Sequence, residues 1–192
     1  MKKLISIILL VLFSCSNDDD GTNSSLPELT FDGKNTFGCL IDGEVFLPRR
    51  NGYTPTPILN SFYKFDNSTS VNNNWFLITA DNNVLEKTIV IEHNLFNIPF
   101  IEGNTYTFGN PNNGILNATY RINKKVEYIE NGKNYFYYQT YQTSNDINGE
   151  ITIMKLDDNE NIISGIFWFD CSDSNGNIVK IREGRFDLKY KK

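Results

Sequence analysis

Short β-branched and aromatic runs alternate with clusters of Asn, Asp and Gly along most of the chain after residue 34, and this alternation most constrains the fold. Hydrophobic periodicity of the helical kind is hard to find there. Residues 36–41 and 44–47 flank Asp42-Gly43, a dipeptide typical of a tight hairpin. We therefore predict an all-β domain of mostly antiparallel strands, with further strands at residues 62–65, 75–80, 87–93, 105–108, 115–129, 134–143, 150–156, 162–171 and 178–190.

The last predicted strand changes its hydrophobic phase. Val179 and Ile181 share one parity, whereas Phe186, Leu188 and Tyr190 share the other. A strand alternates its faces with a period of two, so one face cannot hold both sets without a shift. A β-bulge at Glu183-Gly184 would reset the phase and bend the strand. Long, bent, consecutive strands indicate a curved sheet that forms either a sandwich or a barrel.

The first residues resemble a bacterial lipoprotein signal. Two lysines precede residues 4–13, an uncharged and mostly apolar run that is too short to span a bilayer, which needs about 20 residues. Such a run is typical of the core of a signal peptide. The stretch Leu12-Phe13-Ser14-Cys15 resembles the lipobox, in which the cysteine is acylated and the chain is cut before it. The resemblance implies a signal peptide at residues 1–14 and a membrane anchor, with palmitate among its acyl chains, at Cys15.

Residues 15–34 are rich in Asn, Asp, Ser, Thr and Gly, a composition that predicts a flexible, acidic tether. The run Asp18-Asp19-Asp20 shortly after the lipobox cysteine resembles the surface-export signal of Bacteroidetes-type lipoproteins. We expect a protein anchored in the outer membrane, on either its inner or its cell-surface face. Residues 35–192 then form a single β-rich domain of ordinary size.

The charge of the chain excludes one class of partner. Without residues 1–14 the chain has 16 basic and 23 acidic residues, because Lys2 and Lys3 are lost from the 18 basic residues, and its formal charge is −7. No basic stripe is visible, so we expect no nucleic-acid partner.

The sequence gives little evidence for a catalytic or metal-binding site. His93 is the only histidine and follows apolar residues of the same strand face, so it reads better as a structural residue than as part of a nucleophilic site. The spacing of His93 and the cysteines does not suit zinc. The oxygen-rich stretches 157–161 and 170–177 do not fit the EF-hand pattern and are typical of turns. We therefore predict neither enzymatic activity nor a metal or cofactor, while paired carboxylates of a glycosidase remain an alternative.

Aromatic residues supply the candidate binding site. By strand alternation Tyr135, Tyr137 and Tyr141 share one face, and Trp168 points opposite to its two Phe neighbours. Tyrosine offers a flat apolar surface with a hydroxyl, which suits sugars or protein partners. The alternative is that these aromatic residues pack on the core, since tyrosine is also a good strand former.

Cys39 and Cys171 are the two cysteines left after lipidation. Each cysteine shares a predicted strand face with apolar residues, so both side chains should point inward. Because the envelope exterior permits disulfides, the two cysteines are a candidate disulfide pair. The alternative is two separately buried thiols.

Two segments resemble a known family. Residues 35–48 read NTFGCLIDGEVFLP and residues 163–190 read ISGIFWFDCSDSNGNIVKIREGRFDLKY. Together with the lipobox they resemble an uncharacterised family of Bacteroidetes lipoproteins, a domain of unknown function. The resemblance implies an envelope lipoprotein with a β-rich domain and brings no catalytic residues. The leading hypothesis is a non-enzymatic surface module that binds a glycan, peptide or protein, and the alternatives are a β-barrel carrier of a small apolar ligand and an enzyme.

Overall fold

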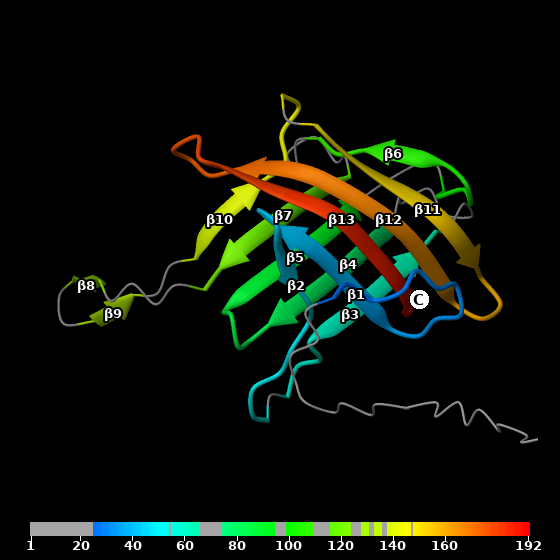
Figure 1. Ribbon diagram of the computed structural model, residues 1–192, viewed down its shortest axis with the longest axis horizontal. Coiled ribbons are helices and arrows are strands. Elements are labelled where there is room, and N and C mark those ends of the chain that lie inside the picture. Colours follow the sequence, from blue (N-terminus) through cyan, green and yellow to red (C-terminus); the bar gives the residue numbers. More distant parts are fainter. Residues whose placement is uncertain are drawn as a thin grey trace, which may run out of the picture.

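The computed structural model describes residues 25–53, 55–65, 74–94, 99–109, 116–123, 128–130, 133–135, 138–146 and 148–192. Within these ranges no helix is long and apolar enough to cross a membrane. The regular structure that they contain is a series of strands (Figure 1): β1 (Thr36–Ile41), β2 (Glu44–Phe46), β3 (Leu59–Lys64), β4 (Trp75–Asn82), β5 (Lys87–Asn94), β6 (Thr105–Thr107), β7 (Asn117–Ile122), β8 (Tyr128–Glu130), β9 (Lys133–Tyr135), β10 (Gln139–Gln142), β11 (Gly149–Asp157), β12 (Ile162–Ser172) and β13 (Ile178–Lys189).

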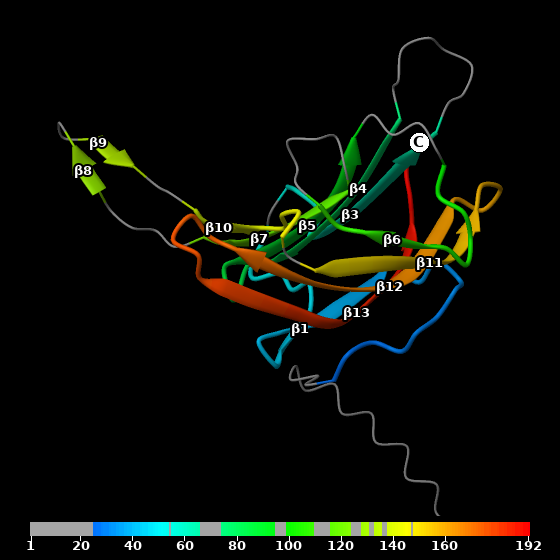
Figure 2. The same ribbon diagram turned by 90° about the horizontal axis from the view of Figure 1, so that it is seen from above.

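Eleven of these strands form one strongly curled antiparallel sheet with the order β2-β1-β13-β12-β10-β7-β5-β4-β3. β11 pairs with β12 and also carries β6, while β8 and β9 form a separate two-stranded ribbon. Figures 1 and 2 show the sheet wrapping round as a half-barrel, with β3 and the end of β13 brought toward each other. The predicted all-β, curved antiparallel sheet is confirmed, and the architecture is closer to a barrel than to a sandwich.

The chain after β13 bonds to the edge strand β3. The backbone N–H of Tyr63 in β3 donates to the carbonyl of Lys191 at 3.0 Å, and the N–H of Lys191 donates to the carbonyl of Ser61 at 3.0 Å. These two bonds occupy backbone groups that an edge strand would otherwise leave unpaired. The C-terminal residues therefore close one end of the curl.

The predicted bulge in β13 is confirmed. Opposite β12, the register moves from Gly184 paired with Phe167 to Ile181 paired with Phe169. The pairing of β13 with β1 shifts at the same place, between Gly38 and Leu40. Glu183 has a φ of 52°, the left-handed backbone that lets an extra residue leave the ladder. The hydrophobic phase changes because one residue is bulged out.

The hairpin between β1 and β2 also follows the sequence. Ile41 pairs with Glu44, and the two residues between them, Asp42 and Gly43, have φ angles of 49° and 90°. Positive φ at both central positions matches the right-handed twist of the strands. Asp and Gly are among the residues that tolerate this conformation.

One apolar cluster fills the inside of the curl. It draws on both end strands of the order and on the strands between them, since Phe46 of β2, Tyr63 of β3 and Ile89 of β5 all belong to it. Its largest fully buried side chains are Phe46, Phe76, Phe169, Phe186, Ile78, Ile89, Ile91, Ile151, Ile153, Ile163, Ile181 and Leu188. Alternating inward positions on the strands supply these residues, as the period of two predicts.

The part of the predicted tether that the structure describes lies against the sheet. Asp187 of β13 is buried, and its carboxylate accepts hydrogen bonds from the N–H groups of Asp32, Gly33 and Lys34. The hydroxyl of Thr30 donates to the same carboxylate at 2.6 Å. Residues 30–34 are therefore fixed to the outer face of β13, whereas residues 15–24 lie outside the described ranges.

Candidate functional site

Of the three tyrosines predicted to form a binding face, the structure describes one side chain, that of Tyr141, and it is buried. Tyr141 in β10 is 6% exposed, its ring stacks on Tyr120 at 5.6 Å, and its hydroxyl accepts a hydrogen bond from the Gln139 amide at 2.6 Å. Tyr141 is thus a core residue and not a surface contact for a ligand. Tyr135 belongs to β9, but its side chain is outside the description, and Tyr137 and Cys15 lie outside the described residues.

Trp168 stands half-exposed on the outer face of β12, opposite in direction to Phe167 and Phe169, as predicted. The guanidinium of Arg182 lies over its ring at 5.3 Å from the centroid and pairs with the carboxylate of Asp170 at 2.5 Å. Two shallow hollows of about 410 and 390 Å³ meet at this indole. The contact with Arg182 therefore holds the indole ring of Trp168 on the outer face of β12.

The predicted disulfide is wrong, because Cys39 and Cys171 are both free, buried thiols. Cys39 belongs to β1 and Cys171 to β12, and β13 lies between these two strands in the sheet. Strands two positions apart are separated by about 9.5 Å, beyond the Cα separation of about 7 Å that a disulfide can join. Burial raises the pKa of both thiols, that of Cys171 to about 12.

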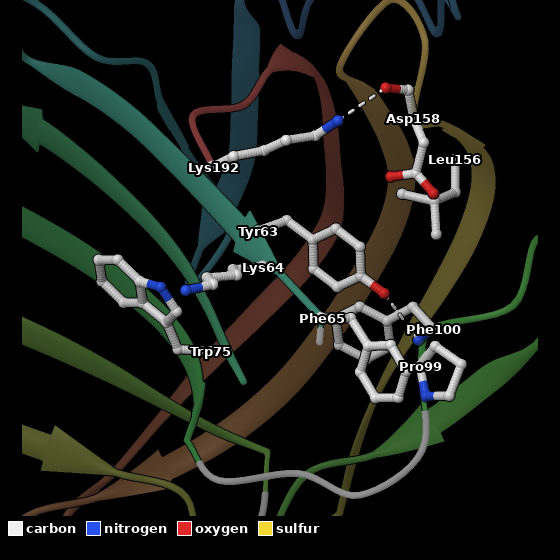
Figure 3. Close-up of a pocket in the computed structure, with 9 residues that line it drawn as sticks. All are labelled: Tyr63, Lys64, Phe65, Trp75, Pro99, Phe100, Leu156, Asp158 and Lys192. Atoms are coloured by element: carbon white, nitrogen blue, oxygen red, sulfur yellow. Dashed lines mark hydrogen bonds between the residues drawn. The ribbon is translucent and has the colours of Figure 1, made fainter. Parts of the chain in front are cut away.

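A cavity opens at the end of the half-barrel where β3 meets the C-terminal residues (Figure 3). Its volume is about 1040 Å³. We call it the mouth site and define it by its lining residues, which are Tyr63, Lys64, Phe65, Trp75, Pro99, Phe100, Leu156, Asp158 and Lys192. They come from β3, the start of β4, the segment before β6, the end of β11 with the turn after it, and the end of the chain.

Aromatic rings form the wall of the mouth site. Tyr63 and Phe100 stack with centroids 5.7 Å apart and planes inclined by 18°. Trp75 stacks on Phe62 at 5.1 Å and 20°, and Figure 3 shows its indole across the opening from this pair. Tyr63 and Phe100 are 3% and 4% exposed and belong to the core cluster, so they form the floor of the cavity. Its accessible apolar ring surface comes from the half-buried Phe65 and Trp75.

The wall is fixed by its own hydrogen bonds. The N–H of Phe100 donates to the hydroxyl of Tyr63 at 3.1 Å, which ties the segment before β6 to β3. Burial raises the pKa of Tyr63 to about 12, so its hydroxyl stays protonated at neutral pH. This oxygen combines a donor and an acceptor at the base of an apolar wall.

Charged groups occupy the rim. The ammonium of Lys192 donates to the backbone carbonyl of Asp158 at 2.9 Å, and Figure 3 shows this side chain crossing the upper edge of the cavity. The carboxylate of Asp158 accepts the hydroxyl of Tyr190 at 2.5 Å. Lys64, paired with Trp75 in the β3–β4 register, extends beside the indole. The site thus combines apolar rings with two ammonium groups and one carboxylate.

Sequence reasoning missed the mouth site because its residues are far apart in the chain. Tyr63 and Lys192 become neighbours only through the hydrogen bonds between β3 and Lys191. The sequence does carry a weak signal, since Phe62, Phe65 and Trp75 gather aromatic residues at the facing ends of two predicted strands. No periodicity shows that the end of the chain returns to this point.

Comparison with known proteins gives one match. The model of a domain of unknown function, DUF6252, covers residues 60–187, about two thirds of the chain. The match runs from β3 into β13 and so includes Tyr63, Lys64, Trp75 and Asp158 of the mouth site. Neither the curated proteins nor the solved structures give a match. By the extent of the match the chain belongs to the family described as the domain of unknown function DUF6252.

Proposed function

We propose that the protein is a non-enzymatic, lipid-anchored binding module of the bacterial envelope that takes a glycan into the mouth site. The observation that carries this proposal is the half-buried rings of Trp75 and Phe65 on one open cavity with polar groups on its rim. Sugar rings present apolar C–H faces together with hydroxyls, so they match stacked aromatic rings beside hydrogen-bonding groups.

The side chains of Asp158 and Lys192 keep hydrogen-bonding positions that a saccharide could occupy. The carboxylate of Asp158 has one oxygen engaged by Tyr190, and an ionised carboxyl group has about four lone-pair positions in all. The Lys192 ammonium donates one of its three protons to the Asp158 backbone carbonyl. Sugar hydroxyls can therefore donate to the acid and accept from the amine without displacing these bonds.

The packed interior favours this site over a carrier function. A carrier for a small apolar ligand needs a lined cavity inside the half-barrel. Phe46, Phe76 and Phe169 fill that interior with the rest of the core cluster. Ligand space at the mouth site is instead open to solvent at one end, which suits an extended chain such as a polysaccharide.

The proposed location rests on the N-terminal residues. The apolar run that ends in Leu12-Phe13-Ser14-Cys15 supports a lipid anchor at Cys15, and the aspartates that follow support transfer to the outer membrane of a Bacteroidetes-type cell. A multiply acylated cysteine holds a protein on a membrane stably, because a second chain converts marginal binding into lasting attachment.

The two tryptophans of the chain provide the test. Full-length protein in detergent micelles would be applied to an array of plant, algal and host glycans, next to the Trp75→Ala and Trp168→Ala variants. We expect the wild type and Trp168→Ala to retain the same glycans and Trp75→Ala to lose them, with thermal unfolding confirming that all three are folded. Retention of no glycan by the wild type, or loss in Trp168→Ala alone, would overturn the proposal.

A further inference from the structure

We infer that the mouth site selects acidic glycans, whose carboxylate or sulfate group is bound by Lys64 and Lys192. This inference deepens the proposed function and rests on it. The formal charge of the whole chain is −5, yet the mouth site has two lysines and a single acid among its lining residues. A cavity whose cationic side chains outnumber its acidic ones favours an anionic ligand there.

The single acidic side chain of the site is held by a neighbouring tyrosine. The Asp158 carboxylate accepts the Tyr190 hydroxyl at 2.5 Å, and the Lys192 ammonium lies against the carbonyl of the same residue at 2.9 Å. Burial, followed by the bond to Asp158, raises the pKa of Tyr190, so its hydroxyl remains a donor. The carboxylate is thereby held by a protein donor, while both ammonium groups keep protons that can point into the cavity.

Lys64 is placed to act together with the aromatic wall. In the β3–β4 register it lies directly opposite Trp75, and its side chain is half-buried. The aliphatic part of a lysine covers apolar surface while its ammonium stays in water. A sugar stacked on the indole would bring a ring substituent close to this ammonium, and the described residues show no ion pair that would compete for it.

The test compares three tetrasaccharides by titration calorimetry on full-length protein in detergent micelles. Tetragalacturonate has carboxylates, a κ-carrageenan tetrasaccharide has sulfates, and β-1,4-galactotetraose is neutral. We expect at least one acidic ligand to bind about tenfold or more tightly than the neutral one, because a hydrogen bond to a charged group contributes about that factor. The acidic ligands separate the two anion sources, since preference for either one identifies the group.

Substitutions locate the effect. Lys64→Gln with Lys192→Gln is expected to weaken acidic binding about tenfold or more and to weaken neutral binding by a clearly smaller factor, whereas Lys64→Arg keeps the acidic binding. Lys180→Gln is the control, because Lys180 is exposed near the other end of β13. Added salt should weaken binding of the acidic ligand by the wild type, Lys64→Arg and Lys180→Gln, and should have much less effect on the double Gln variant.

The possible failures are distinct. Neutral binding as tight as acidic binding, lost in Trp75→Ala, would overturn the inference while the proposed function stands. An equal loss of acidic binding in Lys180→Gln would also overturn it, because the effect would then come from overall charge. Absence of binding to every glycan, in this titration and on the array, would overturn both.

Discussion

At the scale of single residues, Asp187 shows how one carboxylate fixes a long segment to a sheet. It is 1% exposed and accepts hydrogen bonds from three backbone N–H groups of residues 32–34 and from the hydroxyls of Thr30 and Ser164. Burial alone would raise its pKa, but these donors outweigh burial and hold the pKa at about 2. The ionised form is therefore the stable one in the folded protein.

Substitution of Asp187 by Asn should cost about 2–3 kcal/mol of unfolding free energy at pH 7, because hydrogen bonds to a buried charge are lost. The ordinary pKa of 3.8 falls to about 2 on folding. This stabilisation, about 2 kcal/mol, is complete above roughly pH 4 and is lost as the pH falls toward 2. Urea unfolding at several pH values measures both effects. Asp146→Asn, at an exposed position, should change stability by less than about 0.5 kcal/mol, and an equal loss in both variants would contradict the assignment.

A second prediction at the residue scale concerns the reactivity of the two thiols. Cys39 and Cys171 are buried and free, and burial raises both pKa values, so neither forms the reactive thiolate near neutral pH. We expect no reaction with a thiol reagent in the native protein at pH 8, and reaction of both after unfolding in urea without a reductant. Fewer than two thiols in the unfolded, unreduced protein would indicate a disulfide after all.

At the scale of elements, substitutions at Glu183 and Gly184 test the observed bulge in β13. A Cβ at Gly184 would come within 2.5 Å of the Phe167 ring, so Gly184→Ala should destabilise the protein by about 1–3 kcal/mol. Glu183 has a positive φ of 52°, which costs a side chain about 1–2 kcal/mol. Glu183→Gly should therefore be neutral or stabilising by thermal unfolding. The reverse order of the two variants would contradict the observed register.

The strands were predictable where their signals are local. The bulge followed from the opposite parity of Ile181 and Phe186, and the first hairpin followed from Asp42-Gly43, because both depend on residues that are adjacent in sequence. The predicted strand 115–129 is observed in the described ranges as β7 and β8, since a run of strand-forming residues does not show where pairing ends. The order of strands, which separates Cys39 from Cys171, has no local signal at all.

At the scale of the whole molecule, the candidate site depends on long-range closure. The tyrosines of residues 135–141 attracted attention because they are close in sequence, yet Tyr141 packs in the core. The mouth site instead needs Lys191 to bond with β3, which brings Lys192 to a cavity lined by Tyr63 and Phe100. Binding sites at the margins of a sheet arise from such closure, so a single sequence contains their residues but not their proximity.

The last prediction concerns the proposed lipid anchor at Cys15. Only ten residue steps separate Cys15 from Ser25, where the described chain begins, and a fully extended chain of that length spans at most about 35 Å. If Cys15 is acylated, the domain must stay within about that distance of the bilayer surface. Replacement of Cys15 by Ala should abolish labelling by radioactive palmitate and leave the protein unanchored or with its signal peptide uncut, because the lipid attachment site and the cleavage signal are lost together. Cys39→Ala, which changes a buried thiol of the domain, should keep both the label and the membrane association. Palmitate incorporation that persists in Cys15→Ala would show that the anchor lies elsewhere.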